Sequence, residues 1–202
     1  IIYRHLHRAS SCKDVSKARG IYSLMILYGL HTLSSLADRV IRLFALSGCL
    51  EEVNTIFAHV SNPSVYTWNS IISAHIEFSQ PEEAMCLYFQ MIQSGIEPDQ
   101  VSFLYALKVC SEIRGFFHVG RIIHYHIMRY GLDPNVLVGS TLIDMYAKCG
   151  WLVEGHYVLS KLQNRNSISW GVLVSGYARH GCIDFSLYLI ECMNKEGMIL
   201  DK

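Results

Sequence analysis

Apolar residues recur at helical spacing along the chain, in short segments that end at glycines. Gly150 closes one such segment and follows Lys148, and a glycine after a basic last turn is typical of a helix C-terminus. The apolar positions before it fall at intervals that place them on one helical face: Leu142, Ile143, Met145, Tyr146 and Ala147. The segment from Ser140 to Gly150 is therefore predicted to be a capped amphipathic helix.

The same pattern returns upstream, which indicates an internal repeat. Trp68 and Trp170 lie 102 residues apart, and so do Gly48 and Gly150. Self-similarity at a fixed period is the sequence signature of a repeat architecture. The two tryptophans are assigned to the core, because a stack of short repeats must fill its interior with large side chains.

Units of three lengths make up the long period: 35 residues in 65–99, 36 in 100–135 and 31 in 136–166. Residues 1–33 match the 36-residue type in shortened form. The whole chain is predicted to be one array of six units, with Lys202 left over: 1–33, 34–64, 65–99, 100–135, 136–166 and 167–201.

Each unit is predicted to form two antiparallel helices. In the unit 65–99, the first helix is expected from Tyr66 to Phe78, and the second begins at Pro81, followed by Glu82 and Glu83. Proline and negative charge both suit the first turn of a helix. One hairpin cannot bury both of its faces, whereas stacking on neighbours buries them. The predicted fold class is therefore all-α, a superhelical solenoid whose first helices line a concave wall.

Composition excludes several classes of protein. With 51% hydrophobic and 17% charged residues, the chain is too apolar to be disordered. No apolar run reaches the roughly 18 residues of a membrane helix, so a soluble protein without a membrane partner is expected. The formal net charge is zero, which gives no global attraction to a polyanion. The chain has no initiator methionine, so we interpret it as a fragment cut inside a repeat.

Cysteine and histidine positions do not favour a metal site or a disulfide framework. The seven cysteines are odd in number and never spaced as C-x-x-C, so reduced and mostly buried thiols are expected. His124 and His126 lie two positions apart and would face different directions on a helix. No metal ligand, cofactor or small-molecule substrate is predicted.

Four phrases resemble the pentatricopeptide repeat proteins of land plants, in the subclass with alternating P, L and S repeats: VYTWNSIISAH (65–75), MIQSGIEPD (91–99), RIIH (121–124) and STLIDMYAKCG (140–150). The unit lengths of 35, 36 and 31 are those of P, L and S repeats. The resemblance implies an L, S, P, L, S, P order, beginning with the partial unit 1–33. Tetratricopeptide repeats keep a period of about 34 residues and lack these phrases.

The resemblance implies a right-handed superhelix that binds single-stranded RNA in mitochondria or chloroplasts, one base per repeat. In the family, the fifth and last residues of a repeat contact the base edge, and the second residue packs against the bases. Carried onto this chain, the base-edge pairs are Asp38 and Ser64, Asn69 and Asp99, Leu104 and Asn135, Ser140 and Asn166, and Gly171 and Asp201. The packing residues are Tyr66, Val101, Leu137 and Ile168.

Two of these pairs imply defined base preferences. Asn69 with Asp99 resembles the family's uracil reader, and Ser140 with Asn166 resembles an adenine reader. The physical reason is that a carboxylate accepts from the ring N–H of uracil or guanine, whereas an amide can donate to the bare ring nitrogen of adenine or cytosine. The last residue of a unit thus separates keto bases from amino bases.

Three positions depart from the family pattern. Leu104 has no hydrogen-bonding capacity, so little discrimination is predicted there. Gly171 has no side chain, and with Asp201 it predicts only a weak guanine preference. Asp38 stands where a small or amide residue is usual, so its slot receives no base. The predicted footprint from 5′ to 3′ is uracil, unspecified, adenine and a weak guanine.

Two function classes remain open from the sequence. The first is an RNA-recognition module, the targeting part of an organellar C-to-U editing or RNA-processing factor, with editing-complex proteins as further partners. The second is a helical-repeat scaffold that binds proteins. His75-Ile76-Glu77 fits the H-x-E half of a zinc deaminase signature, but no P-C-x-x-C follows. The segment is therefore predicted to be a binder without catalytic residues.

Overall fold

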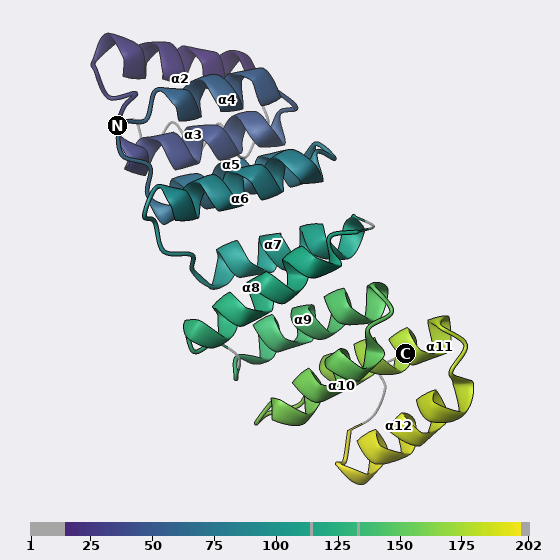
Figure 1. The fold of residues 1–202 in the computed structure, drawn as a ribbon. Coiled ribbons are helices and arrows are strands. Elements are labelled where there is room, and N and C mark those ends of the chain that lie inside the picture. Colours follow the sequence, from purple (N-terminus) through teal and green to yellow (C-terminus); the bar gives the residue numbers. More distant parts are fainter. Residues whose placement is uncertain (1–14, 114, 133, 199–202) are drawn as a thin grey trace. The chain divides into compact units, whose positions relative to one another are not determined.

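The computed structural model describes residues 15–113, 115–132 and 134–198 of the chain (Figure 1). The described residues contain helices and turns and no strand. The helices, in chain order, are α2 (Val15–Leu27), α3 (Ser34–Leu46), α4 (Leu50–Ala58), α5 (Val65–Glu77), α6 (Pro81–Gln93), α7 (Gln100–Glu112), α8 (Phe117–Arg129), α9 (Val136–Lys148), α10 (Leu152–Lys161), α11 (Ser167–Arg179) and α12 (Ile183–Lys195).

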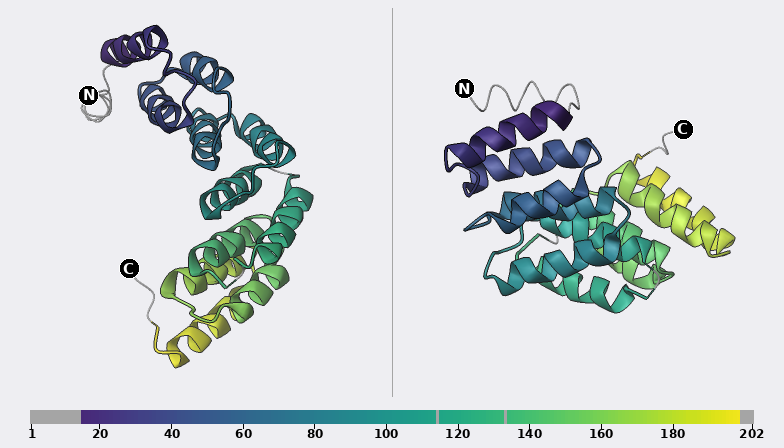
Figure 2. Two further views of the ribbon diagram at one scale, coloured as in Figure 1. Left: turned by 90° about the vertical axis from the view of Figure 1, so that its left-hand side faces the viewer. Right: turned by 90° about the horizontal axis from the view of Figure 1, so that it is seen from above.

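The chain divides into two compact units, Ile1–Tyr105 and Ala106–Lys202. In the first unit, α3 packs against α2, α4 and α5, and α5 also packs against α6 (Figures 1 and 2). Phe44, Ile56 and Tyr88 are fully buried between these helices. Trp68 on α5 is buried and meets the ring of Phe57 edge-on at 4.7 Å between centroids. The predicted core position of this tryptophan is confirmed.

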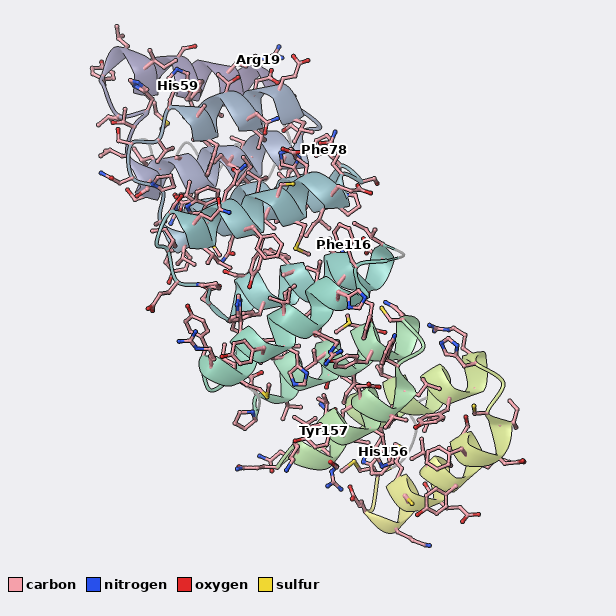
Figure 3. The ribbon with its side chains drawn as sticks, viewed as in Figure 1. Arg19, His59, Phe78, Phe116, His156 and Tyr157 are labelled. Carbon is pink, nitrogen blue, oxygen red and sulfur yellow. The ribbon has the colours of Figure 1, made fainter. Side chains whose placement is uncertain are left out.

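Polar contacts supplement this packing at the surface of the first unit. Arg19 on α2, labelled in Figure 3, donates from Nε to Oε1 of Glu52 on α4 at 3.1 Å. The pair raises the pKa of Arg19 and lowers that of Glu52, mainly through this hydrogen bond. Both groups are solvent-screened, so the contact orients α2 and adds little stability.

In the second unit, α9 packs against α10 and α11, and α11 packs against α12. The helices α9 and α11 approach each other closely at Gly176, where a Cβ would lie 2.6 Å from the Cβ of Ala147. Leu173 and Met193 are fully buried, and Trp170 is buried as the sequence predicted. A side chain at position 176 would therefore have to push two backbones apart.

Helix ends follow the predicted signals. Pro81 is the first residue of α6, and Glu82 and Glu83 lie in its first turn. Helix α9 ends at Lys148, Cys149 is its C-cap, and Gly150 follows with φ of +81°. Only glycine adopts this left-handed conformation without strain, so the predicted glycine stop is confirmed.

Two expectations need correction. Helix α5 spans Val65–Glu77, one residue earlier at each end than predicted, because Ser64 caps it. The thiols are not mostly buried: among the described cysteines only Cys110 is buried, while Cys86 and Cys182 are exposed. Periodicity alone did not reveal that Cys86 lies on the solvent face of α6. Burial raises the pKa of the Cys110 thiol to about 12, which keeps it protonated.

The helix boundaries do not test every prediction. The division into P, L and S units stays a prediction, because the bounds show helix pairs and not repeat types. Asp201, Cys12 and the first 14 residues lie outside the described residues. Within the described ranges, no helix has both the length and the apolar character that a membrane crossing requires.

Candidate nucleic-acid interface

A groove of about 780 Å³ runs over the first helices of the first unit, α3, α5 and α7. Its floor and walls combine carboxylates, an amide, two arginines and aromatic rings. The side chains that line it are Asp38, Arg39, Arg42, Ala45, Leu46, Tyr66, Asn69, Ser70, Ser73, Glu77, Asp99, Val101 and Tyr105. Five residues predicted to face RNA thus share one groove: Asp38, Tyr66, Asn69, Asp99 and Val101.

Asn69 and Asp99 are hydrogen-bonded to each other within this groove. The amide Nδ2 of Asn69 donates to Oδ1 of Asp99 at 2.9 Å, across 30 residues of sequence. Ser102 links the two: its hydroxyl donates to Oδ1 of Asn69 at 2.8 Å, and its backbone N–H donates to Oδ1 of Asp99 at 2.9 Å. The network fixes both predicted base readers before any ligand arrives.

The donor and acceptor atoms that this network does not use are those that could bind a ligand. All the hydrogen bonds that Asp99 accepts go to Oδ1, so its Oδ2 remains available as an acceptor within the described part of the chain. Asn69 uses one of its two amide hydrogens, which leaves one donor. An acceptor beside a donor is thus presented from two adjacent first helices.

Apolar and aromatic side chains stand on both sides of this pair. Tyr66, in the first turn of α5, is 67% exposed, and Val101, in the first turn of α7, is 40% exposed. Both line the groove. A flat ring inserted between them would find a stacking surface on one side and an aliphatic surface on the other.

The second unit contains a related arrangement. Asn166 accepts from the backbone N–H of Ser169 through Oδ1 at 2.8 Å, which leaves its Nδ2 as a donor. Ser140 is 7% exposed, and its hydroxyl has no partner among the described residues. Leu137 and Ile168 are exposed in the first turns of α9 and α11.

The last residue of a predicted unit also serves as the N-cap of the next first helix. The side chains of Ser64, Asp99, Asn135 and Asn166 each accept from a backbone N–H two or three residues later. Sequence reasoning missed this role, because these residues were considered only as base readers. A signal was present: Ser, Asp or Asn directly before an apolar helical run is typical of an N-cap.

Ser64→Ala is expected to lower the free energy of unfolding by about 1 kcal/mol, because the N–H of Thr67, a buried residue in the first turn of α5, loses its acceptor. Urea unfolding followed by circular dichroism measures the change. Ser61→Ala in the exposed preceding turn is the matched control and should shift stability by less than about 0.5 kcal/mol. Equal stability of the two variants would contradict the capping role.

The remaining predicted readers are placed as follows. Leu104 is half-buried on α7 in the first compact unit, and Asn135 caps α9 in the second. Gly171 is half-buried in α11, and its partner Asp201 lies outside the described residues. Asp38 is half-buried on α3. The structure therefore places Asn69 with Asp99 in one network and leaves the other pairs as predictions.

His75 of the H-x-E motif is a buried structural side chain. Its two ring nitrogens bond to Oε1 of Gln80 and Oδ1 of Asn54, both at 2.9 Å. Both nitrogens are therefore engaged in joining α5 to α4 and to the turn before α6. Within the described ranges, no group of three His, Cys, Asp or Glu side chains is arranged to hold a metal ion.

Models of known protein families match several stretches of this chain. Residues 63–112 match the PPR repeat family, and residues 140–167 and 168–198 each match the PPR repeat. Together these matches cover more than half of the chain. The chain belongs to the pentatricopeptide repeat (PPR) family. The matched ranges include α5, α7, α11 and most of α9, which carry Tyr66, Asn69, Val101 and Ser140.

Curated relatives of this PPR chain are plant proteins. It is 32% identical over 98% of its length to the chloroplastic pentatricopeptide repeat-containing protein At4g25270 of Arabidopsis thaliana, and covers 38% of that protein. It is 31% identical over 95% of its length to At4g16470 of the same plant, again covering 38%. The chain thus spans about two fifths of the length of these relatives.

Solved structures show the same fold. The crystal structure of the pentatricopeptide repeat protein PPR10 from maize superposes with a TM-score of 0.81 at 22% identity, covering 96% of this chain and 28% of that one. A second structure, PPR10 in complex with an 18-nt psaJ RNA element, gives a TM-score of 0.78 and 22% identity, covering 96% of this chain and 30% of that one. The predicted all-α solenoid of stacked helix pairs is confirmed.

Proposed function

We propose that this chain binds single-stranded RNA with sequence preference, using one helix pair per base. The observation that carries the proposal is the hydrogen-bonded pair of Asn69 and Asp99 in the groove of the first helices, between exposed Tyr66 and Val101. The related fold of PPR10, whose crystal structure holds an 18-nt RNA element, supports the same function.

The free atoms of the Asn69 slot suit uracil. Oδ2 of Asp99 accepts from the ring N3–H of uracil, and the remaining N–H of Asn69 donates to a neighbouring carbonyl oxygen. Cytosine has a bare ring nitrogen at the same position and would face the carboxylate with a lone pair. Loss of one such bond costs about 1–3 kcal/mol, or roughly one to two decades in affinity.

The Ser140 slot suits adenine. Because Oδ1 of Asn166 is held by the N–H of Ser169, the amide is oriented with Nδ2 outward, where it donates to the bare N1 of adenine. The short side chain of Ser140 leaves room for a purine beside that amide, and its hydroxyl is itself buried. The intervening Leu104 slot selects no base, and the Gly171 slot gives a weak guanine preference.

Charge in the groove is mixed, which limits the electrostatic part of binding. Arg39 and Arg42 line it together with Asp38, Glu77 and Asp99. Two arginines attract phosphates, but the nearby carboxylates prevent a strongly positive field. Base contacts are therefore expected to contribute more to affinity than phosphate contacts do, and the affinity should depend weakly on salt concentration.

Selection of bound RNAs from a randomised single-stranded pool tests this function. The chain should enrich uracil and adenine two nucleotides apart, with the base between them unselected. Circular dichroism of the same preparation verifies that it is helical. Equal recovery of all sequences by a helical, folded chain would refute the proposal.

We further assign this chain to the subclass with alternating P, L and S repeats, and we propose that it targets organellar RNA processing or C-to-U editing. Its relative At4g25270 is named chloroplastic, which supports an organelle, chloroplast or mitochondrion, as the location. The segment itself acts as a binder, and any catalytic step belongs to other residues or to editing-complex proteins.

A protein-binding role is a second candidate, supported by exposed apolar side chains on second helices of the second unit. Tyr157 on α10, labelled in Figure 3, is an example. The others on α8, α10 and α12 include Ile122, Tyr125, Met128, Val153, Ile183, Leu187 and Tyr188. In the first unit, α4 and α6 expose no comparable side chain, whereas α2 exposes Leu24, Ile26 and Leu27. Large exposed apolar groups of this kind are typical of protein interaction sites.

A further inference from the structure

We propose that Ser102 is a positioning residue for the slot of Asn69 and Asp99, and that its hydroxyl group sets how strongly this slot prefers uracil over cytosine. Ser102 is the third residue of α7 and is fully buried, so it acts through the two base readers and does not touch RNA. This role rests on the proposed RNA binding and falls to a residue that the sequence did not single out.

The side chain of Ser102 closes a ring of hydrogen bonds with the two readers. Its hydroxyl oxygen accepts from the backbone N–H of Asp99 at 3.2 Å, and its hydroxyl donates to Oδ1 of Asn69 at 2.8 Å. Oδ1 of Asp99 accepts from Nδ2 of Asn69 and from the backbone N–H of Ser102, both at 2.9 Å. Because these two N–H groups already occupy Oδ1 of Asp99, we assign the single hydroxyl hydrogen to Asn69. Hydrogen bonds in such a ring strengthen one another.

The ring determines which way the amide of Asn69 points. Its oxygen faces a donor, the Ser102 hydroxyl, and its nitrogen faces an acceptor, the Asp99 carboxylate. If the amide turned over, its oxygen would face the carboxylate and its nitrogen would face the hydroxyl. Asn69 is buried, so its Oδ1 depends on Ser102 for a donor. Without the hydroxyl, the amide would lose one of the two partners that oppose this rotation.

The corresponding side chains of the other first helices do not join two base readers. Thr67 in α5 and Ser169 in α11 are also third residues, and within the described ranges their hydroxyls bond only to the N-cap residue of their own helix. Val138 stands at this position in α9 and has no hydroxyl. Of these four side chains, only that of Ser102 also reaches the reader on the preceding first helix, Asn69.

A fixed amide discriminates between bases because it cannot adapt to the wrong one. In the proposed pairing, the outer N–H of Asn69 meets the carbonyl oxygen O4 of uracil. Cytosine carries an amino group at that position, so two donors would face each other. An amide that is free to turn presents its oxygen to the amino group instead and tolerates cytosine. A side chain that is ordered before binding also loses less entropy when the base arrives.

Titration of the 202-residue chain with two single-stranded RNAs, which differ only in uracil or cytosine at this slot, tests the role of Ser102. Ser102→Thr keeps the hydroxyl, whereas Ser102→Val replaces it with a methyl group on a side chain of the same shape. Both residue types already occupy the third position of other first helices, as Thr67 and Val138. The uracil preference, measured as the ratio of the two Kd values, should persist in Ser102→Thr and fall about three- to tenfold in Ser102→Val.

Ser169→Val is the matched control, because it makes the same change where the hydroxyl does not reach a second base reader. It should leave the ratio at the Asn69 slot unchanged. Urea unfolding of each variant measures stability alongside. A merely structural role of Ser102 would lower stability and weaken the binding of both RNAs equally, and that result would refute the positioning role.

Two further outcomes would also count against Ser102. An equal fall of the ratio in Ser102→Thr and Ser102→Val would show that the hydroxyl is not responsible. A full uracil preference in Ser102→Val would refute the positioning role and leave the proposed function standing. Absence of any base preference in the unchanged chain would overturn both.

Discussion

Asp99→Asn is expected to change the base preferred by the Asn69 slot from uracil to cytosine. The Asn69 amide and the Ser102 backbone N–H both donate to Oδ1 of Asp99, and an asparagine oxygen can take the place of that atom. The only atom exchanged is then Oδ2, which becomes an amide nitrogen. It donates to the bare N3 of cytosine and no longer accepts from N3–H of uracil. The ratio of the two Kd values should reverse by roughly tenfold to hundredfold.

Asn166→Asp is the reciprocal change in the second unit. Its Oδ1 keeps the bond from the N–H of Ser169, while Nδ2 becomes an acceptor. Adenine should lose preference to guanine, because guanine carries a ring N1–H where adenine has a bare nitrogen. Each variant thus serves as the control for the other.

Kd values for RNAs that vary at one position measure both exchanges. Each variant should alter selection only at its own slot, because the two slots lie in different compact units and share no described partner. The free energy of unfolding should stay within about 0.5 kcal/mol of that of the unchanged chain, since Asn and Asp cap helices equally well. A loss of affinity for all four bases, without an exchange of preference, would contradict base reading by these residues.

Gly176→Ala is expected to destabilise the second unit by about 1–2 kcal/mol. The added methyl group would lie 2.6 Å from the Cβ of Ala147, and neither atom can move without its backbone. Overpacking of this kind costs about 1–3 kcal/mol, from which the better helix propensity of alanine recovers part. The free energy of urea unfolding measures the difference.

Gly20→Ala provides a control for the same substitution in an open environment. A Cβ at Gly20 in α2 meets no atom within 4 Å. Alanine should therefore stabilise the chain by about 0.5–1 kcal/mol through helix propensity alone. Ala147→Gly combined with Gly176→Ala should be more stable than the sum of the single changes predicts, because the methyl groups no longer collide. Strict additivity would argue against the close approach of α9 and α11.

Much of the fold could be predicted from the sequence, because its signals are local. Pro81 with Glu82 and Glu83 marked the start of α6, and Gly150 marked the end of α9. The core positions of Trp68 and Trp170 followed from their place in the repeated pattern. The first residue of α5 was predicted one position late, because the capping role of Ser64 was not recognised.

The site could be predicted only in part, because its geometry depends on stacking between hairpins. Asn69 and Asp99 were paired by family resemblance, but their mutual hydrogen bond and the bridging Ser102 depend on how α5 and α7 meet. The unsatisfied oxygen of Asp38 also depends on tertiary burial, which periodicity does not report. A cysteine pattern likewise could not distinguish buried Cys110 from exposed Cys86.

The capping role of the unit-final residues limits how far the base preference of the chain can be changed by substitution. Ser64, Asp99, Asn135 and Asn166 each cap the start of a helix, and we propose that unit-final residues also face the ligand. Only a few side chains do the first task well: Ser, Thr, Asp and Asn. Helix capping therefore restricts the residue types at these positions, whichever base is bound. An exchange between Asp and Asn should change the base preference with little change in the free energy of unfolding. An apolar or long basic residue should remove the base preference and also destabilise the helix that it begins.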